Sequence, residues 1–539
     1  MVEEKKNPVA SDVRSARSSQ ERDLKDEVLE SVPTDQLPLE TFIEYAKLER
    51  ELEEIDYDKH KGREVDQSRL QQLIDELGLQ DEIAAANRAL RMASWFNIFT
   101  LITTDILGPQ KAPWAFAQLG FVPASLIYVA FGVVATYAAL LLTHMYLKLS
   151  SSKFPLRNYS ELAPRAIGGV FGRYFKFVMD GMQILQFVFQ LSGLILQNGQ
   201  ALSQMAHGSA CFSGVMFAFA AAGMVINQVR SLTHLSKLTT FNFCINLLVL
   251  FATMGIVANS APNYLSAQKN NGVSGTKVIA ELFAKNTMSQ KFVGAMNISY
   301  AYGGAMLFVE FMAEMRRPRD FWKGLFCAQT IIILVYLVYG IVVYYYQGQF
   351  SINPANQGIS PYKWQTAMNA LILFTQFVSA AIYCNVAVKV IYRSIIERVF
   401  HGPSMVTKRG RVIFSVSVVI FYTVSYVLAS AIPQFSNVTG FFAALLMVPF
   451  SYLFPSLLVL ALRVREDGLK KGFCSIQPTN PHWWNAILWD KWCLKVFDFF
   501  IVIGSLVCMG MGSWSSIVAM VQTFKNQGAS TSFGCDPPV

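Results

Sequence analysis

The chain of 539 residues is 53% hydrophobic, has a mean hydropathy of +0.35 and carries a formal net charge of +9. Only 15% of its residues are charged, whereas soluble domains carry about a quarter, so water is excluded as the solvent for most of the surface. The basic residues stand between apolar runs and form no basic patch interleaved with aromatic residues, which excludes nucleic-acid binding. The composition indicates an integral membrane protein.

The first 92 residues are polar and contain no apolar run of the kind that begins a secretory signal. We therefore expect a cytosolic N-terminal region, 1–92. Residues 1–33 are rich in Ser, Lys and Glu and are expected to be disordered, and 39–52 and 68–92 are expected to form amphipathic helices. Two interpretations stay open: a solvated tail, or a region that binds cytosolic regulators.

From Trp95 onward, long apolar runs alternate with short loops. A bilayer core of about 30 Å needs about 20 apolar residues per helix, and about eleven runs fit that length. The pattern predicts an all-α polytopic membrane protein, with a transmembrane domain at 93–523 and a short extracellular tail at 524–539. The expected spans are 95–119, 122–149, 174–200, 212–226, 238–259, 293–312, 321–345, 366–392, 412–431, 438–462 and 496–522.

Charge bias between the loops predicts the orientation. Lys and Arg concentrate in the loops after even-numbered spans and are sparse in the others, which places the N-terminus in the cytoplasm and, with an odd span count, the C-terminus outside. Cys211 and Cys535 would then share the outer face, where both a disulfide and free thiols stay open. Cys244, Cys327 and Cys384 lie in apolar runs and are expected to be small buried residues. No cysteine or histidine spacing fits a metal site, so we expect neither metal nor cofactor.

The first span contains a glycine and two prolines within six residues, at 108–113. Such a segment cannot continue an α-helix, because proline removes a backbone donor and crowds the preceding turn. The polar residues Thr104, Asp105, Gln110 and Lys111 stand at the same depth. Irregular backbone is tolerated in hydrocarbon only where it is buried in protein or lines a cavity, so we predict a broken helix 1 at a binding site.

The sixth span carries a second interruption, with Gly303 and Gly304 after Tyr302. Interruptions at corresponding positions of two halves are typical of transporter substrate sites. Helix N-termini within such breaks offer free N–H groups to a carboxylate, and unwound carbonyl groups can face an ammonium group. This is the chemistry that an α-amino acid requires.

The segment GPQKAPWAFAQLG at 108–120 resembles the helix 1 signature of the amino acid/auxin permease family, and EFMAEMRRP at 310–318 resembles that family's P-E-I-x-x-E-M-x-x-P element. The resemblance covers about 95–522 and is strongest to fungal neutral amino-acid permeases. It implies a LeuT-like five-plus-five inverted repeat with broken helices 1 and 6 and one added helix. It also implies amino-acid uptake driven by H⁺ or Na⁺.

Carried over to this sequence, the family's site would include Gly108 and Ala112 in helix 1, and Tyr302 and Gly303 in helix 6. Gln110 and Lys111 stand where the family has small or apolar residues, so Lys111 departs from the pattern. Three roles stay open for its charge: it neutralises an acidic substrate, pairs with Asp105, or replaces a coupling cation.

Ionisable residues within membrane spans are functional candidates. Asp105, Asp180 and Glu310 are the carboxylates that we expect to carry the coupled proton, whereas Glu314 is expected to pair with the arginines at 316–319. Helix 3 presents glutamines on one face, of which Gln190 is predicted to reach the substrate. That face lines a wet pathway or bonds neighbouring helices, and both interpretations stay open.

The sequence therefore predicts a secondary active transporter, with no enzyme activity, that imports neutral amino acids by proton symport and alternating access. Its partners would be the amino acid, the proton and the lipid bilayer, in the plasma membrane. A sodium-coupled carrier, a nutrient sensor on the same scaffold, a passive channel and a vacuolar location are the alternatives. No nucleophile–base pair or phosphate-binding loop supports an enzyme.

Overall fold

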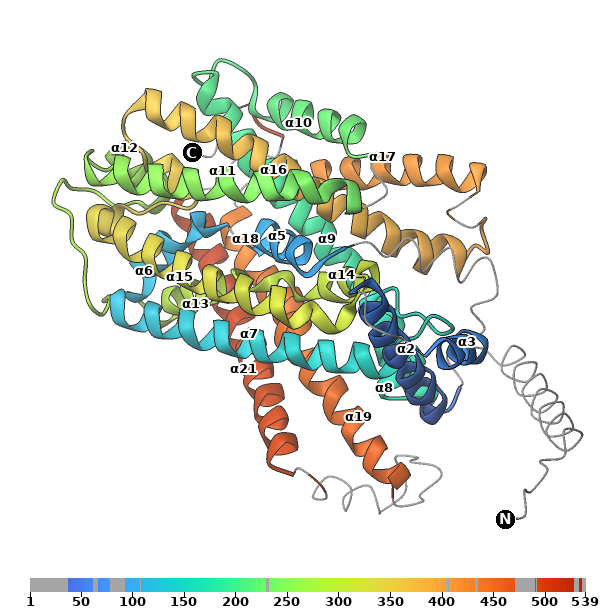
Figure 1. Ribbon diagram of the computed structural model, residues 1–539. Coiled ribbons are helices and arrows are strands. Elements are labelled where there is room, and N and C mark those ends of the chain that lie inside the picture. The colour runs from blue at the N-terminus through green and yellow to red at the C-terminus, as the bar shows by residue number, and fades with distance from the viewer. Residues whose placement is uncertain are drawn as a thin grey trace, which may run out of the picture.

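The computed structural model of the chain is built from helices (Figure 1). It describes residues 37–61, 66–77, 93–106, 108–228, 232–403, 405, 407–431, 435–470, 490, 492–527 and 533–535. Within these ranges the β-pairing is limited to two isolated bridges, Ala93 with Met315 and Pro262 with Ile359. The predicted all-α class is confirmed.

Nine helical stretches of the described chain are long and apolar enough to cross a membrane, by length and composition. They are Phe121–Leu149, Gly169–Met205, Leu238–Ala258, Met288–Glu314, Pro318–Phe350, Tyr362–Glu397, Lys408–Ala431, Thr439–Lys470 and Trp492–Gln522. A shorter apolar helix spans Phe212–Ile226, and the first predicted span holds two short helices. The multi-pass membrane fold is confirmed, and the count of eleven crossings stays a prediction.

Individual elements have the following bounds. In chain order they are α2 (Leu39–His60), α3 (Gln67–Glu76), α5 (Trp95–Ile106), η2 (Pro109–Lys111), α6 (Ala112–Leu119), α7 (Phe121–Leu149), η3 (Tyr159–Glu161), α8 (Leu162–Ala166), α9 (Gly169–Met205), α10 (Phe212–Ile226), α11 (Leu232–Ala258), α12 (Tyr264–Asn271), α13 (Met288–Tyr300), η4 (Gly303–Leu307), α14 (Phe308–Glu314), η5 (Pro318–Asp320), α15 (Phe321–Gln347), η6 (Gly348–Phe350), η7 (Ala355–Gly358), α16 (Tyr362–Ile391), η8 (Tyr392–Glu397), α17 (Lys408–Ala431), α18 (Phe435–Phe442), η9 (Ala443–Met447), η10 (Pro449–Leu453), α19 (Phe454–Lys470) and α21 (Trp492–Gln527).

The turn between α6 and α7 requires glycine. Gly120 has φ +92°, and a Cβ there would lie 2.6 Å from the backbone nitrogen of Ala284. Its neighbour Val122 donates its N–H to the carbonyl of Leu282 at 3.1 Å. The loop before α13 therefore lies directly against this turn, since only a residue without a side chain permits that approach.

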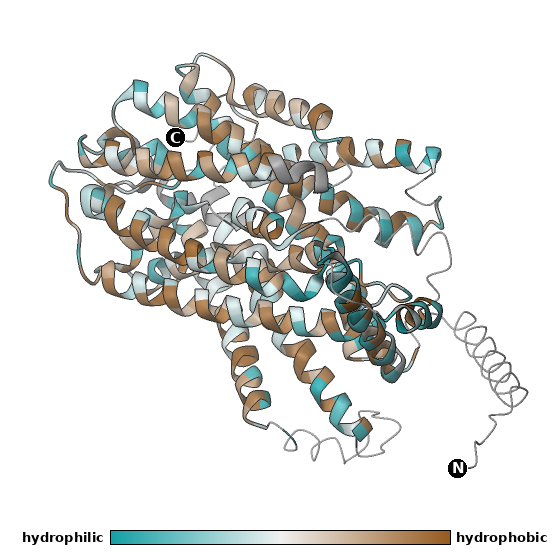
Figure 2. Ribbon diagram, in the orientation of Figure 1, coloured by the Kyte–Doolittle hydropathy of each residue, from teal (hydrophilic) through white to brown (hydrophobic). Residues whose placement is uncertain are grey.

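The outer surface of the helix bundle is apolar. Leu126, Phe251 and Phe500 are 64–66% exposed and project from α7, α11 and α21. Figure 2 shows hydrophobic residues along the long helices and a largely hydrophilic α3, with hydrophilic residues also on α2. Large exposed apolar side chains over many helices are expected when lipid is the solvent.

The last helix, α21, is held by buried charges near its first turns. Asp498 is fully buried, accepts a hydrogen bond from the Tyr137 hydroxyl at 2.7 Å and pairs with Arg463. Lys495 Nζ lies 2.5 Å from Asp467 Oδ2. These pairs join α21 to α7 and α19, because a buried charge is tolerated only when it is paired.

Cys211 and Cys535 form a disulfide across 324 residues of sequence, so the bonded alternative is the one the structure shows. Cys384 is buried as expected. The prediction is wrong for Cys244 and Cys327, which are exposed. A small thiol on the outer face of a helix faces lipid, so an apolar run in the sequence does not by itself place a cysteine in the protein interior.

Candidate functional site

The first interruption lies between α5 and α6, which are separated by the short turn η2. The N–H of Gly108 donates to the Tyr336 hydroxyl of α15 at 3.1 Å. The carbonyl of Thr104 accepts a hydrogen bond from Ser379 of α16 at 3.2 Å. Hydroxyl groups from two other helices therefore satisfy backbone groups beside the break, as buried irregular backbone requires.

The second interruption follows α13, which ends at Tyr300 and gives way to the turn η4 and then α14. Tyr302 is 1% exposed and donates its hydroxyl to the carbonyl of Tyr128 at 2.9 Å. A Cβ on Gly303 would lie 2.2 Å from the sulfur of Met447. The backbone at this turn therefore lies directly against the Met447 side chain.

A cavity of about 110 Å³ lies between the two interruptions. Its walls come from α5, η2, α7, α9, α11, α13, η4, α15, α16 and η9. The residues that line it are Thr104, Gly108, Pro109, Gln110, Lys111, Tyr128, Gln190, Gly193, Leu194, Gln197, Asn246, Leu250, Asn297, Tyr300, Ala301, Gly303, Gly304, Tyr336, Ile372, Thr375, Gln376, Ser379, Tyr383 and Met447.

Seven residues predicted for the substrate site line this cavity: Thr104, Gly108, Gln110, Lys111, Gln190, Gly303 and Gly304. The other two, Ala112 and Tyr302, do not. Ala112 is fully buried at the start of α6. The Tyr302 ring packs against Tyr128 and Tyr336, two residues that themselves line the cavity, and so lies behind the lining. A residue beside a broken helix can thus serve packing alone.

Lys111 is the charged residue among those that line the cavity in the described chain. Its Nζ lies 3.8 Å from the centre of the Tyr300 ring, a distance at which the ring face attracts a cation. Tyr300 donates its hydroxyl to Gln190 Oε1 at 2.5 Å, and Gln190 Nε2 donates to the Tyr383 hydroxyl at 3.1 Å. This sequence of contacts crosses the cavity from η2 through α13 and α9 to α16.

Two buried acceptors in the cavity wall have no hydrogen-bond partner among the described residues. They are Gln110 Oε1 and Asn297 Oδ1. Unpartnered buried polar atoms are rare in native structures and are expected where a ligand or water binds. The cavity therefore offers one cationic group and at least two free acceptors to a bound molecule.

Two of the predicted proton-coupling carboxylates, Glu310 and Asp180, lie outside the cavity lining. Glu310 of α14 is 7% exposed, and its Oε1 accepts hydrogen bonds from the Tyr159 N–H at 3.3 Å and Gln183 Nε2 at 3.2 Å. Asp180 of α9 is 4% exposed, and its Oδ1 accepts from the Ser160 hydroxyl at 2.5 Å. The consecutive residues 159 and 160 of η3 thus contact both carboxylates. The side chain of Asp105 lies outside the described residues.

Glu314 does not pair as predicted. Its Oε1 lies 2.9 Å from Lys389 Nζ of α16, whereas Arg317 pairs with Asp320 at 3.7 Å. The prediction relied on closeness in sequence, and the helix packing brings α16 nearer to this carboxylate. Within the described chain no group of three or more His, Cys, Asp or Glu residues could hold a metal ion.

Sequence reasoning missed several cavity residues. Tyr336 and Tyr383 line the cavity from the unbroken helices α15 and α16, and Met447 lines it from the end of the π-helical segment η9. Hydroxyl-bearing tyrosines inside apolar runs were the available signal for the first two, because a buried hydroxyl needs a hydrogen-bond partner. Met447 gives no such signal, since an apolar residue in a span predicts only burial.

Comparison with known proteins gives a family and distant relatives. The family described as transmembrane amino acid transporter protein matches residues 88–477. The N amino acid transport system protein of Neurospora crassa is 24% identical over 458 residues, which cover 82% of this chain and 87% of that protein. The auxin transporter-like protein 4 of Medicago truncatula is 22% identical over 467 residues, covering 83% of this chain and 87% of that protein.

Among solved structures, Mhp1, described as a nucleobase-cation-symport-1 family transporter in a closed conformation, is similar with a TM-score of 0.43 and 11% sequence identity. The similarity covers 83% of this chain and 96% of Mhp1.

Proposed function

Because this chain belongs to the transmembrane amino acid transporter family, we propose that it imports neutral amino acids by proton symport. The fold would be a LeuT-like five-plus-five inverted repeat, and alternating access would expose the cavity to each side of the membrane in turn. The substrate would bind between the interruptions after α5 and α13. This proposal is carried by one observation: the cavity joins both interruptions and holds polar groups that match an α-amino acid.

The substrate carboxylate would lie against the positive side of the cavity. Lys111 is the N-terminal cap of α6, so its ammonium group and the positive end of that helix act on the same region. A cation and a helix N-terminus favour a carboxylate strongly where water is excluded. The substrate ammonium group would be bound by the free acceptors Gln110 Oε1 and Asn297 Oδ1.

The charge of the cavity favours a zwitterion. One lysine among the described lining residues can balance one carboxylate, and an acidic side chain would add a second negative charge with no further cation to meet it. A basic side chain would meet Lys111 with like charge. Neutral amino acids fit this balance, and Lys111 would take the role of carboxylate ligand.

Glu310 and Asp180 would carry the coupled proton, together with Asp105. Glu310 is buried in α14, and its Oε2 has no hydrogen-bond partner among the described residues. An acid with one free oxygen inside a membrane protein can bind a proton there without breaking an existing contact. The sodium alternative would use the hydroxyl oxygens of Thr375 and Ser379, which both line the cavity.

The proposed location is the plasma membrane, with the N-terminus in the cytoplasm. The disulfide between Cys211 and Cys535 supports an outer position for that face, because disulfides persist in oxidising compartments. A tagged chain that localised to the vacuolar membrane would contradict the location and leave the transport mechanism in place.

The test is radiolabelled uptake of neutral, acidic and basic amino acids into proteoliposomes in sodium-free buffer, with and without an inward-acid pH gradient. Accumulation of neutral amino acids that a protonophore abolishes is the expected result. Lys111→Met should abolish that uptake, and Glu310→Gln should leave only downhill exchange of substrate.

Accumulation that requires sodium would replace the proton with sodium in the mechanism. Flux that never exceeds the substrate gradient would indicate a channel. Binding without any flux would favour a nutrient sensor.

A further inference from the structure

Helix α2 lies across one end of the helix bundle, beside the ends of α7 and α8 (Figure 1). Its apolar residues face the bundle: Leu39, Phe42 and Leu52 are 2–3% exposed. Phe42 and Tyr45 pack edge-on against Phe154, with ring centres 5.6 and 5.3 Å apart. The helix is therefore docked on the transmembrane domain and not merely tethered to it.

The first contact is with the loop that follows α7. Glu49 is fully buried and accepts hydrogen bonds from the N–H and the hydroxyl of Ser152, at 3.1 and 2.8 Å. Arg50 donates to the carbonyl of Ser150 at 3.0 Å and bonds Glu53 at 2.7 Å. A buried carboxylate is costly unless it is hydrogen-bonded, so the two bonds from Ser152 are what allow Glu49 to be buried against the bundle.

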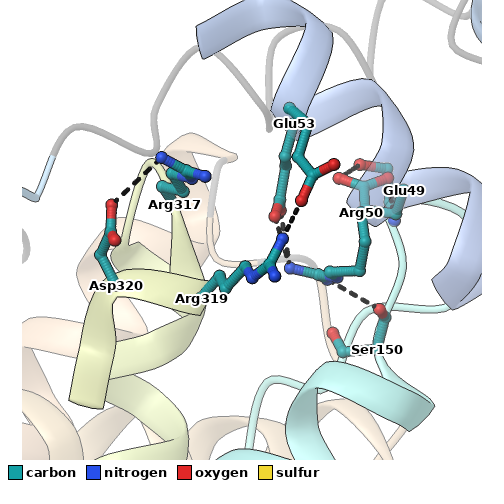
Figure 3. A network of polar contacts seen from close by, with 9 residues as sticks. Glu49, Arg50, Glu53, Ser150, Arg317, Arg319 and Asp320 are labelled. Atoms are coloured by element: carbon teal, nitrogen blue, oxygen red, sulfur yellow. Dashed lines mark hydrogen bonds and ion pairs between the residues drawn. The ribbon is translucent and has the colours of Figure 1, made fainter.

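The second contact is with the basic loop between α14 and α15. Arg319 pairs with Glu54, and Arg316 lies 3.6 Å from Asp56. The Arg317 guanidinium lies 4.1 Å from the centre of the Tyr57 ring. Figure 3 shows Arg317 and Arg319 next to α2, and Ser150 close to Arg50 of that helix. Acidic residues of α2 thus face basic residues of the loop.

We call residues 150–154, Arg165 and 316–319 the docking surface. Its two sides are connected to different helices. Arg165 of α8 lies under Phe42 at 4.7 Å, and its carbonyl accepts a hydrogen bond from Arg465 of α19 at 2.8 Å. The loop 316–319 continues from α14, the helix after the second interruption. Helix α2 therefore joins α14 to α8 and α19.

The start of α5 is joined to the same place. Ala93 donates its N–H to the Glu314 carbonyl at 3.2 Å and accepts from the Arg316 N–H at 3.1 Å. The ends of α5 and α14, the helices adjoining the two breaks, are thus held together beneath α2. Because α2 contacts both sides, separation of these ends from α8 would break either the Glu49 contact with Ser152 or the contacts of Glu54 and Asp56 with the 316–319 loop.

We infer that α2 is an intramolecular clamp that holds this end of the molecule closed and slows opening of the cavity toward the cytoplasm. The clamp consists of residues 39–60 docked on the docking surface. Release of α2 lets α5 and α14 move away from α8, which opens the cavity on this side. The inference rests on the proposed function for its transport consequence, and the docking itself stands apart from any substrate.

The test compares Glu49→Ala with Glu51→Ala in the full chain. Glu51 lies on the same helix but faces solvent and α3, where it pairs with Arg69 at 2.8 Å. Two readouts are needed: amide hydrogen exchange across residues 39–60, and labelling of Ser379→Cys in the cavity by a membrane-impermeant thiol reagent. Inverted membrane vesicles present the cytoplasmic face to the reagent, and mass spectrometry identifies the labelled peptide.

Glu49→Ala should raise both exchange and labelling about tenfold, because it leaves the Ser152 donors without their acceptor. Glu51→Ala should change neither. Unchanged exchange in Glu49→Ala would show that α2 is not held through this contact and would overturn the inference. Raised exchange with unchanged labelling would overturn the clamp's effect on the cavity.

A charge swap checks the second contact. Glu54→Arg should raise labelling roughly two- to fivefold, since a partly exposed ion pair is lost and like charges meet. Adding Arg319→Glu should restore the original rate. A double variant that labels as fast as the single one would overturn the role of the 316–319 loop.

Neither readout needs transport. A failure of amino-acid uptake with the expected labelling would therefore refute the proposed function alone.

Discussion

Substitution of Gly303 is the most direct test of the substrate site, because the Met447 side chain occupies the space that a side chain at position 303 would need. A Cβ at this position would lie 2.2 Å from the Met447 sulfur and 2.4 Å from its methyl carbon. Ordinary contact between such atoms is about 3.5–4.0 Å, so Gly303→Ala must displace the thioether by about 1.5 Å. Methionine is flexible enough to make that shift without unfolding the helix.

Met447 and Gly303 both line the substrate cavity, so the added methyl group and the shifted thioether change the space that is left for the substrate. A methyl group occupies about the volume of a water molecule, roughly 30 Å³, against a cavity of about 110 Å³. Overpacking of this kind costs about 1–3 kcal/mol. If the substrate-bound state bears that cost, affinity falls about 5- to 150-fold.

The assay is the KM for the best substrate of the wild-type protein in proteoliposomes, with protein amount and folding checked by size-exclusion chromatography. Gly303→Ala should raise KM, and the double variant Gly303→Ala/Met447→Ala should bring it back toward the original value. Gly255→Ala is the matched control, because a Cβ there has no atom within 4 Å. An unchanged KM in Gly303→Ala would refute the assignment of η4 to the substrate site.

Three further predictions concern stability. Asp498→Asn leaves the partly buried Arg463 without its charge partner and should cost about 1–3 kcal/mol, seen as a lower thermal unfolding midpoint; a midpoint equal to wild type would contradict the pairing. Cys211→Ser should lower that midpoint as well, since the bond to Cys535 closes a long loop; equal midpoints under reducing conditions are the control. Burial alone would raise the pKa of Glu161, but nearby basic groups outweigh it and lower the pKa below its ordinary value of 4.5. The ionised Glu161 carboxylate therefore stabilises the folded state above about pH 4.5, and this stabilisation is lost as the pH falls further. Unfolding measured from pH 3.5 to 6 should show a shallower pH slope in Glu161→Gln, and identical slopes would contradict this.

The sequence was most informative where a residue type has one strong structural effect, as long apolar runs, prolines and glycines do. Runs of about 20 apolar residues predicted the spans, and the prolines and glycines at 108–113 and 303–304 predicted where the cavity lies. The position of a helix break, however, does not say which neighbouring side chains point into it. Ala112 is beside the break, but its side chain is buried among neighbouring residues, whereas Gln110 two positions earlier lines the cavity.

Helix packing decided the remaining differences. Glu314 meets Lys389, which lies 75 residues away in sequence, and a loop pattern alone favoured the nearer arginines. The docking of α2 depends in the same way on the shape of the 150–154 loop. Contacts between distant segments follow from three-dimensional packing, and a single sequence records only that their residues are polar or apolar.

The hydroxyl contacts at the first interruption have a consequence for how this site can change. Tyr336 and Ser379 bond the backbone at Gly108 and Thr104 through side chains, each of which turns about single bonds. Backbone hydrogen bonds of a helix give way only several at a time, but these two can be exchanged one by one through rotation of a side chain. The break is therefore a hinge that is held by two separate side-chain hydrogen bonds. A substitution such as Tyr336→Phe would remove one of these hydrogen bonds and leave the shape of the cavity nearly unaltered.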